Sequence, residues 1–401
     1  YWITNLLQAP LLAFLLSYVN RYYDASKQQY TFNENENLPV YIFIAIIVAI
    51  FSGLVGSAEE IISDRKVLRR ERFLHLSKNS YFLAKISVLY WQYWLILFSC
   101  SAFANLLGLN ISSAFKSVIT VYILIPLLLI PQLVLGGIVI RFDKVNPDFK
   151  INANDHIPWF SEFLASRWAF EALVVAQFKD NCYESPLYQY DKAIASAEYK
   201  KVFYLEKLKQ ILQETKENPS TTYQNFHVIK TELEREFEHI DKKEIPNLYA
   251  FSIPKYKQSV YAYSEKAFQK IRVYYQNRQK NAQRQRDSFL RANPKHQELR
   301  FLYHNDAISM LARNTNSDKK LVVHKTHIEP LINSIYIDAH DISAHFFAPN
   351  KKVLHKSLDT YWFNLGIIWL MIFSLYVTLY LNILPRIVNQ ITKWFTGIHS
   401  T

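Results

Sequence analysis

Residues 39–57 read PVYIFIAIIVAIFSGLVGS, and residues 59–78 follow with EEIISDRKVLRRERFLHLSK, a short segment rich in arginine. About 20 consecutive apolar residues cross the hydrocarbon core of a bilayer, so the first run predicts a membrane span. Short basic loops remain on the cytoplasmic side of a membrane. The two stretches together predict a polytopic membrane protein with the basic segment in the cytoplasm.

The other apolar runs set the number of spans. They cover residues 3–19, 81–110, 118–140 and 358–384. The run at 81–110 is long for one span and short for two spans with a turn. We expect six spans, because the tail with Arg386 and Lys393 is then cytoplasmic, as the charge rule favours. Five spans would place the polar middle of the chain in the cytoplasm and the tail outside.

Composition agrees with a membrane protein that carries a large polar part. Aromatic residues make up 15% of the 401 residues, and many of them flank the apolar runs, as interfacial tyrosine and tryptophan do. The two cysteines, Cys100 and Cys182, predict neither a disulfide framework nor a thiolate metal cluster. The net charge of +12 is compatible with binding to anionic lipid or to nucleic acid, and the positions of the basic residues along the chain decide between these partners.

The polar middle of the chain begins with IPWFSEFLASRWAFEALVVAQF at residues 157–178. Glu162, Arg167 and Glu171 interrupt this aromatic stretch, so we expect a re-entrant or interfacial helix rather than a span. Beyond it, helical spacing predicts charged helices at 193–217, 231–240 and 264–291.

These patterns predict a mainly α fold, a polytopic membrane helical bundle of about six spans with a large helical extracytoplasmic insertion between the last two. The expected parts are spans in 1–140 with a cytoplasmic coupling helix at 58–80, an external segment at 141–183, the insertion at 184–356, and the last span with its cytoplasmic tail at 357–401.

Three stretches resemble the white-type, G-subfamily ABC exporters and their bacterial relatives. They are FSGLVGSAEEIISDRKVLRRERF at 51–73, ILIPLLLIPQLVLGGIVIRFDKVNP at 123–147 and SEFLASRWAFEALVVAQF at 161–178. The wording NLLGLNISSAF at 105–115 is most similar to members of the Bacteroidetes type. The resemblance implies an ABC-type-2 permease, a multi-pass protein of the bacterial inner membrane that works as a homodimer. The charged stretch at 183–352 has no counterpart in the eukaryotic members.

The resemblance also implies that the basic segment is a coupling helix that contacts an ATPase. Its expected contact residues are Glu59, Glu60, Asp64, Arg65, Arg69, Arg70, Glu71 and Arg72. The alternative is a loop that sets topology, with its charges solvated or bound to lipid phosphates.

The chain lacks the Gly-rich phosphate-binding motif G-x-x-x-x-G-K-[ST] and has seven glycines in all. The resemblance to ABC exporters then implies that ATP and Mg²⁺ bind a nucleotide-binding domain that precedes Tyr1 or lies on a separate subunit. The chain itself carries no catalytic motif and would be one part of an ATP-hydrolysing translocase.

Polar side chains inside the apolar runs are candidates for a substrate path. They are Asn5, Gln8, Asn105, Asn110, Gln132 and Asn364. For each of them, a hydrogen bond between helices is the more common role. Because the runs contain few ionisable groups, we expect a hydrophobic or amphipathic, lipid-like cargo, moved out of the cytoplasm or the inner leaflet, rather than an ion.

Other charged and histidine-rich stretches receive plainer interpretations. His324 with His327, and Asp338, His340, Asp341 with His345, could share a metal, but we expect solvated histidines and no metal site. The basic run at 266–291 would suggest RNA on a soluble protein, but we expect no nucleic acid for an extracytoplasmic region. The alternative function is a membrane-anchored scaffold or receptor whose insertion binds an envelope partner. A third interpretation, an enzyme that modifies lipids, has no support, because the sequence shows no pairing of a nucleophile with a base.

Overall fold

The computed structural model is mainly helical, as the sequence predicts. It describes residues 32–58, 95–115, 117–140, 157–217, 222–238, 257–324, 327–339, 344–353 and 356–398, with residues 142, 145 and 240 and scattered residues between 11 and 30. The chain divides into two compact units. Unit 1 comprises residues 1–177 and 339–401, and unit 2 comprises residues 178–338.

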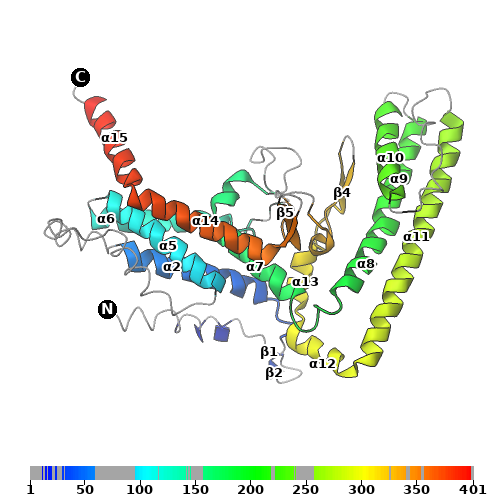
Figure 1. Ribbon diagram of the computed structural model, residues 1–401, viewed down its shortest axis with the longest axis horizontal. Helices are drawn as coiled ribbons and strands as arrows, with labels where there is room; N and C mark the ends of the chain where they lie inside the picture. Colours follow the sequence, from blue (N-terminus) through cyan, green and yellow to red (C-terminus); the bar gives the residue numbers. More distant parts are fainter. Residues whose placement is uncertain are drawn as a thin grey trace. The chain divides into compact units, whose positions relative to one another are not determined.

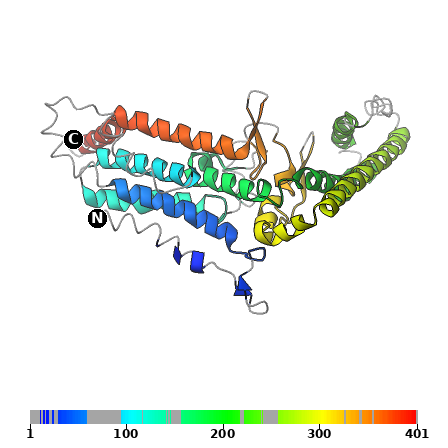
Figure 2. The same ribbon diagram turned by 60° about the horizontal axis from the view of Figure 1, so that its bottom comes forward.

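Among the described residues of unit 1, three helices are long and apolar enough to cross a membrane, and Figure 1 shows where they lie. These helices are α2 (Leu38–Ala58), α5 (Leu95–Ala114) and α14 (Thr360–Tyr380). Helix α5 packs against both α2 and α14, and it is the most buried of the three. The same three helices lie side by side in the turned view of Figure 2.

A fourth apolar helix, α6 (Val118–Val134), is shorter than the run that we expected to span at 118–140. Residues 135–140 form bends instead of a further turn and a half of helix. Gly137 adopts a φ of +99°, which glycine tolerates far better than other residues do. A Cβ at Gly137 would also lie 2.7 Å from Cζ of Phe346. The chain therefore leaves the helical path at the glycine pair.

The contact of α2 with α5 depends on a small residue. A Cβ on Gly53 would overlap the carbonyl oxygen of Ser101 and lie 3.0 Å from Cβ of Ala104. Small residues let the backbones of membrane helices approach closely, and van der Waals packing then holds them together. Glycine at this position thus fixes the distance between α2 and α5.

Shorter elements complete unit 1. They are β1 (Tyr23–Asp24), β2 (Gln29–Tyr30), η4 (Trp159–Phe163), α7 (Ala165–Lys179, whose last two residues belong to unit 2), β5 (Asn350–Val353), β6 (Lys356–Asp359) and α15 (Ile383–Ile398). Strands β5 and β6 pair antiparallel and lead directly into α14. The side chain of Asp359 caps α14 by accepting a hydrogen bond from the backbone N–H of Tyr361 at 3.0 Å.

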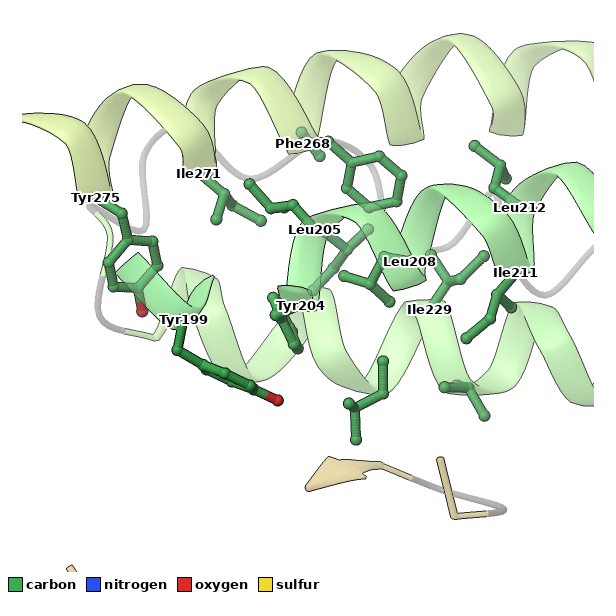
Figure 3. Close-up of a cluster of buried hydrophobic side chains, with 14 of the residues drawn as sticks. Tyr199, Tyr204, Leu205, Leu208, Ile211, Leu212, Ile229, Phe268, Ile271 and Tyr275 are labelled. Carbon is green, nitrogen blue, oxygen red and sulfur yellow. The ribbon is translucent and has the colours of Figure 1, made fainter. Parts of the chain in front are cut away.

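Unit 2 has a hydrophobic core of its own. Its elements are α8 (Tyr188–Tyr199), the π-helical segment η5 (Lys200–Tyr204), α9 (Leu205–Glu217), α10 (Thr222–Phe237), α11 (Lys257–Ala292), α12 (Pro294–Tyr303), α13 (Asp306–Arg313), β3 (Leu321–Val323), β4 (Ile328–Pro330) and η10 (Ser334–Tyr336). Figure 3 shows Leu208 of α9, Ile229 of α10 and Phe268 of α11 meeting in this core. The helices cover the stretches predicted at 193–217 and 264–291 and begin earlier than predicted, whereas α10 begins at Thr222 and ends at Phe237, three residues before the predicted end at 240.

The spans expected near residues 3–19 and within 81–94 fall largely or wholly outside the described residues. The coupling helix expected at 58–80 lies there too, apart from Ala58 at the end of α2. The count of six spans therefore stays a prediction. The two β-hairpins near the end of the polar region were not predicted from the sequence.

Candidate functional site

Four buried polar side chains form a charge cluster in unit 1, defined here as Arg167, Glu171, Lys351 and Asn364. Each is at most 1% exposed. Arg167 and Glu171 lie one helical turn apart on α7, so they share a face of that helix. Lys351 comes from β5 and Asn364 from the second turn of α14. Helix α7 thus meets two neighbouring segments, β5 and α14, whose residues lie 180 and 193 positions after Glu171 in the sequence.

Glu171 is the centre of the cluster. Lys351 Nζ donates to its Oε1 at 2.8 Å, and Asn364 Nδ2 donates to its Oε2 at 2.9 Å. Arg167 Nη1 lies 3.8 Å from the same Oε2 and 3.4 Å from Oε2 of Glu162. Among the described residues, Glu171 therefore has three polar partners, whereas the Lys351 amine forms a salt bridge with one carboxylate.

The surroundings of the cluster are aromatic. The guanidinium carbon of Arg167 lies 3.8 Å from the ring centroid of Trp168, and the Phe346 ring lies 5.9 Å away. An arginine over an aromatic face gains a cation–π attraction that is larger when the pair is desolvated. Asn364 Nδ2 also donates to the carbonyl oxygen of Trp168 at 3.0 Å, so α14 is hydrogen-bonded to the α7 backbone as well.

The electrostatics keep Glu171 ionised. Burial acts to raise the pKa of Glu171, but the attractions of Lys351 and Arg167 outweigh it, and the pKa lies below its ordinary value. Burial also lowers the pKa of Lys351, and the Glu171 carboxylate opposes that shift. The ions are stable in this place only while they remain together, because an unpaired buried charge is very costly.

Two polar atoms of the cluster have no hydrogen-bond partner among the described residues. They are Nε of Arg167 and Oδ1 of Asn364. One is a donor and the other an acceptor, and both belong to side chains that converge on Oε2 of Glu171. Buried groups of this kind are usually satisfied, so the cluster is less than fully paired in this conformation.

The cluster can act as a lock between α7, the β5–β6 hairpin and α14. Any movement that separates α7 from α14 must break the hydrogen bonds of Asn364 to Glu171 and to Trp168. Removing one partner of a buried ion pair costs about 3–5 kcal/mol. Helices α7 and α14 are therefore expected to be either held together by the cluster or fully separated, with no stable intermediate spacing.

Further hydrogen bonds tie the apolar helices to one another. Asn110 Nδ2 of α5 donates to the carbonyl oxygen of Leu375 at 2.9 Å, and Thr378 Oγ1 donates to Asn110 Oδ1 at 3.0 Å, which joins α5 to α14. Gln132 of α6 accepts from the Ser166 N–H at 3.0 Å, and Ser166 Oγ donates to the Gln132 carbonyl at 2.8 Å. These contacts link α6 to the start of α7.

The structure locates four of the six candidate path residues. Asn110, Gln132 and Asn364 are buried and make bonds between elements, as the alternative interpretation describes. Asn105 of α5 is buried as well, and its Oδ1 has no partner among the described residues. Asn5 and Gln8 lie outside the described residues, as do all eight residues expected to contact the ATPase.

Sequence reasoning missed the pairing of Glu171 with Lys351. The charges of 157–178 were interpreted only as reasons against a span, although a charge in an aromatic stretch also calls for a buried counter-ion. The local sequence carries no signal for Lys351, because only the folded hairpin decides that β5 buries Lys351 and exposes Lys352.

In a comparison with known families, residues 88–178 match the family described as ABC-2 type transporter. This range includes α5, α6, η4 and all of α7 except its last residue, Lys179. Comparison with curated proteins and with solved structures gives no match. The match and the apolar helices together support an integral membrane protein that is the permease component of an ABC transporter. Permeases of this family pair with an ATP-binding subunit.

Proposed function

We propose that this chain is the membrane permease of a white-type, G-subfamily ABC exporter of the bacterial inner membrane, of the Bacteroidetes type. It forms a homodimer and moves a hydrophobic or amphipathic, lipid-like substrate out of the cytoplasm or inner leaflet. A nucleotide-binding domain, on the same polypeptide or on a separate subunit, binds ATP and Mg²⁺. The observation that carries the proposal is the ABC-2 match over residues 88–178.

The packing of unit 1 supports a route from the motor to the cluster. Helix α2 ends at Ala58, where the basic segment begins, so a push on that segment acts directly on α2. The close approach at Gly53 couples α2 to α5, and Asn110 couples α5 to α14. Near its N-terminal end, α14 carries Asn364 and therefore the charge cluster. A displacement at the ATPase thus has a continuous path of packed helices to follow.

The exposed faces of the apolar helices support a lipid-like substrate and a second copy. In α6, Ile119 is 72% exposed and Ile123 is 67% exposed, and in α14 Phe373 is 66% exposed. In the bilayer such faces contact lipid tails or another copy of the chain. An amphipathic substrate can travel along them without a chain of ionisable groups.

The test uses inverted membrane vesicles that contain the full chain with its ATP-binding subunit. A fluorescent short-chain phosphatidylethanolamine is the probe, and ATP-dependent protection from dithionite is the readout. We expect the triple variant Arg69→Gln/Arg70→Gln/Arg72→Gln to reduce protection to the ATP-free background. The matched control removes three exposed charges of α11, Arg278→Gln/Lys280→Gln/Arg284→Gln, and should transport normally.

Co-purification separates the parts of the proposal. If the wild type holds its ATP-binding subunit but never protects the probe, the lipid-like substrate is wrong and the permease class stands. If the triple variant holds the subunit and transports as the wild type does, the coupling role of the basic segment is refuted. In a Ser63→Cys variant, labelling of the new thiol by a membrane-impermeant maleimide on intact cells would place the basic segment outside the cytoplasm and would also refute its coupling role.

The scaffold alternative is favoured by one feature, which is the separate core of unit 2. Leu205, Leu208 and Ile229 are fully buried there, and a plain connecting loop needs no such core. A scaffold would keep its partner when the arginine triplet is removed and would show no ATP-dependent change in the vesicle assay. The permease proposal expects ATP-dependent protection of the probe by the wild type and loss of that protection in the arginine variant.

A further inference from the structure

The β3–β4 hairpin of unit 2 places two histidines and a glutamate on one face. Val322 pairs with Glu329, and Val323 pairs with Ile328. The register continues by one more position, since the His324 N–H donates to the His327 carbonyl oxygen at 2.8 Å. Opposite residues of an antiparallel pair share a face, and successive residues alternate. His324, His327 and Glu329 therefore lie on the same side of the hairpin.

The other side of the hairpin is anchored in the core of unit 2. Ile328 is 4% exposed and belongs to the core shared by α9, α10 and α11. Its N–H donates to Oε1 of the buried Glu232 at 2.8 Å, and Tyr204 Oη holds the second oxygen of Glu232 at 2.7 Å. The backbone that carries the histidine face is thus fixed by packing and by a buried carboxylate, which is how a rigid ligand set is supported.

The three side chains converge rather than merely share a face. Potential ligand atoms of His324, His327 and Glu329 all lie within 4.8 Å of one another. Nε2 of His324 lies 3.0 Å from Oε2 of Glu329, and the two imidazole rings stack with centroids 4.6 Å apart. Ligand atoms around a tetrahedral zinc ion, with bonds near 2.0–2.1 Å, are about 3.3 Å apart. Because all three ligand atoms already lie within 4.8 Å of one another, an approach of at most about 1.5 Å brings each pair to this spacing.

Partial burial separates this group from ordinary surface histidines. The side chain of His324 is 15% exposed and that of Glu329 is 26% exposed. Arg235 of α10 carries a positive charge in this region, and it pairs with Glu232 at 3.6 Å. The donor set is therefore two imidazoles and one carboxylate in a partly desolvated place. The positive charge of Arg235, which would repel a metal ion, is balanced by the Glu232 carboxylate.

We propose that His324, His327 and Glu329 bind a divalent transition-metal ion of the zinc class. Imidazole suits zinc, copper, iron and nickel, and two histidines with one glutamate is a known three-ligand set for zinc. Three protein ligands leave a fourth position open for water or another ligand. The site is outside the residues matched to the ABC-2 family, and it does not depend on transport.

The test is a metal titration of the full chain in detergent, purified without a histidine tag and stripped with a chelator. The background carries Cys182→Ser, because this exposed thiol could bind the same ions. Cobalt(II) is the probe, since its visible absorption reports nitrogen and oxygen ligands, and zinc(II) displaces it. We expect one saturable cobalt ion per chain, displaced by an equal amount of zinc.

Three variants and one control decide the outcome. Removal of an outer-shell partner lowers metal affinity by roughly 10–100-fold. Because His324 and His327 would be direct ligands, His324→Ala and His327→Ala should each lower the cobalt affinity by more than this. Glu329→Gln should weaken it by at least about tenfold. His227→Ala removes an exposed histidine of α10 and should change nothing. Metal-free melting temperatures near the wild-type value show that the variants fold.

The proposal is overturned by either of two results. One is a wild-type chain without a saturable cobalt spectrum. The other is a His324→Ala/His327→Ala double variant that binds cobalt as tightly as the wild type does.

Discussion

Glu171 and Lys351 form one ion pair, yet their removal should not have equal effects. Glu171→Gln leaves the ammonium of Lys351 and the guanidinium of Arg167 buried, with no ionised carboxylate between them. Lys351→Met leaves the carboxylate of Glu171 with Asn364 at 2.9 Å and Arg167 at 3.8 Å. We therefore expect Glu171→Gln to destabilise unit 1 more than Lys351→Met does.

The size of the effect follows from burial. Breaking a buried pair by removing one partner costs about 3–5 kcal/mol, and Glu171 and Lys351 are 0% and 1% exposed, so solvent does not reduce this figure. We assign the upper part of the range to Glu171→Gln and about 3 kcal/mol or less to Lys351→Met. At about 2–4 °C per kcal/mol for a unit of 150–250 residues, a loss of about 4–5 kcal/mol in the first variant should lower the melting temperature by at least about 8 °C.

The assay is thermal unfolding of the purified full chain in detergent, combined with a double-mutant cycle. The double variant Glu171→Gln/Lys351→Met should show a coupling energy of about 0.5–3 kcal/mol between the two sites. Lys352→Met is the matched control, because Lys352 is the exposed neighbour on β5, and it should stay within about 0.5 kcal/mol of the wild type. Equal losses for the two single variants, or additive losses in the double variant, would refute the central role of Glu171.

Other predictions concern helix contacts, pH and topology. Gly53→Leu should destabilise by about 1–3 kcal/mol in thermal unfolding through overlap with Ser101, whereas Gly366→Ala, with open space at its Cβ, should not destabilise. Asn110→Leu should cost about 0.6 kcal/mol and at most about 1.7 kcal/mol; a loss of transport with stability unchanged would instead mark a substrate contact. The stabilisation from ionised Glu171 is complete above its ordinary pKa of 4.5 and is lost as pH falls through its lower folded-state pKa. The melting-temperature difference between the wild type and Glu171→Gln should therefore shrink below about pH 4.5. A difference that grows below this pH would contradict the predicted direction. An impermeant maleimide should label the exposed Cys182 on intact cells if unit 2 is extracytoplasmic; labelling only after lysis would place it inside.

The apolar helices could be predicted because length and hydrophobicity suffice for a span. Helices α2 and α14 lie within the runs found at 39–57 and 358–384, give or take a residue at the ends. The end of α6 could not be predicted, since a Gly-Gly pair is also common inside membrane helices. Helix α6 ends at Val134, and the positive φ of Gly137 beside Phe346 keeps the chain from resuming the helix; that contact joins positions more than 200 residues apart in sequence.

The charge cluster shows what a single sequence leaves out. Arg167 and Glu171 are visible as a pair at helical spacing, but nothing local distinguishes Lys351 from the exposed Lys352 next to it. The difference arises because β5 presents alternate residues to opposite faces, and only the folded hairpin decides which face meets α7. In the β3–β4 hairpin the pair His324 and His327 is visible in the sequence, but the register of the folded strands is what adds Glu329 to the same face.

The polar contacts of unit 1 also constrain how it can move. Helix α14 is bonded to α5 near its C-terminal end through Thr378 and to α7 near its N-terminal end through Asn364. The first contact involves neutral groups and should cost about 1 kcal/mol to break, whereas the second contains buried ions and costs several times more. A force that enters through α2 and α5 therefore breaks the Asn110 contact before the charge cluster opens. We infer that α14 and α7 move together in small displacements, and that they separate only in a transition large enough to offset the exposure of Glu171 and Lys351.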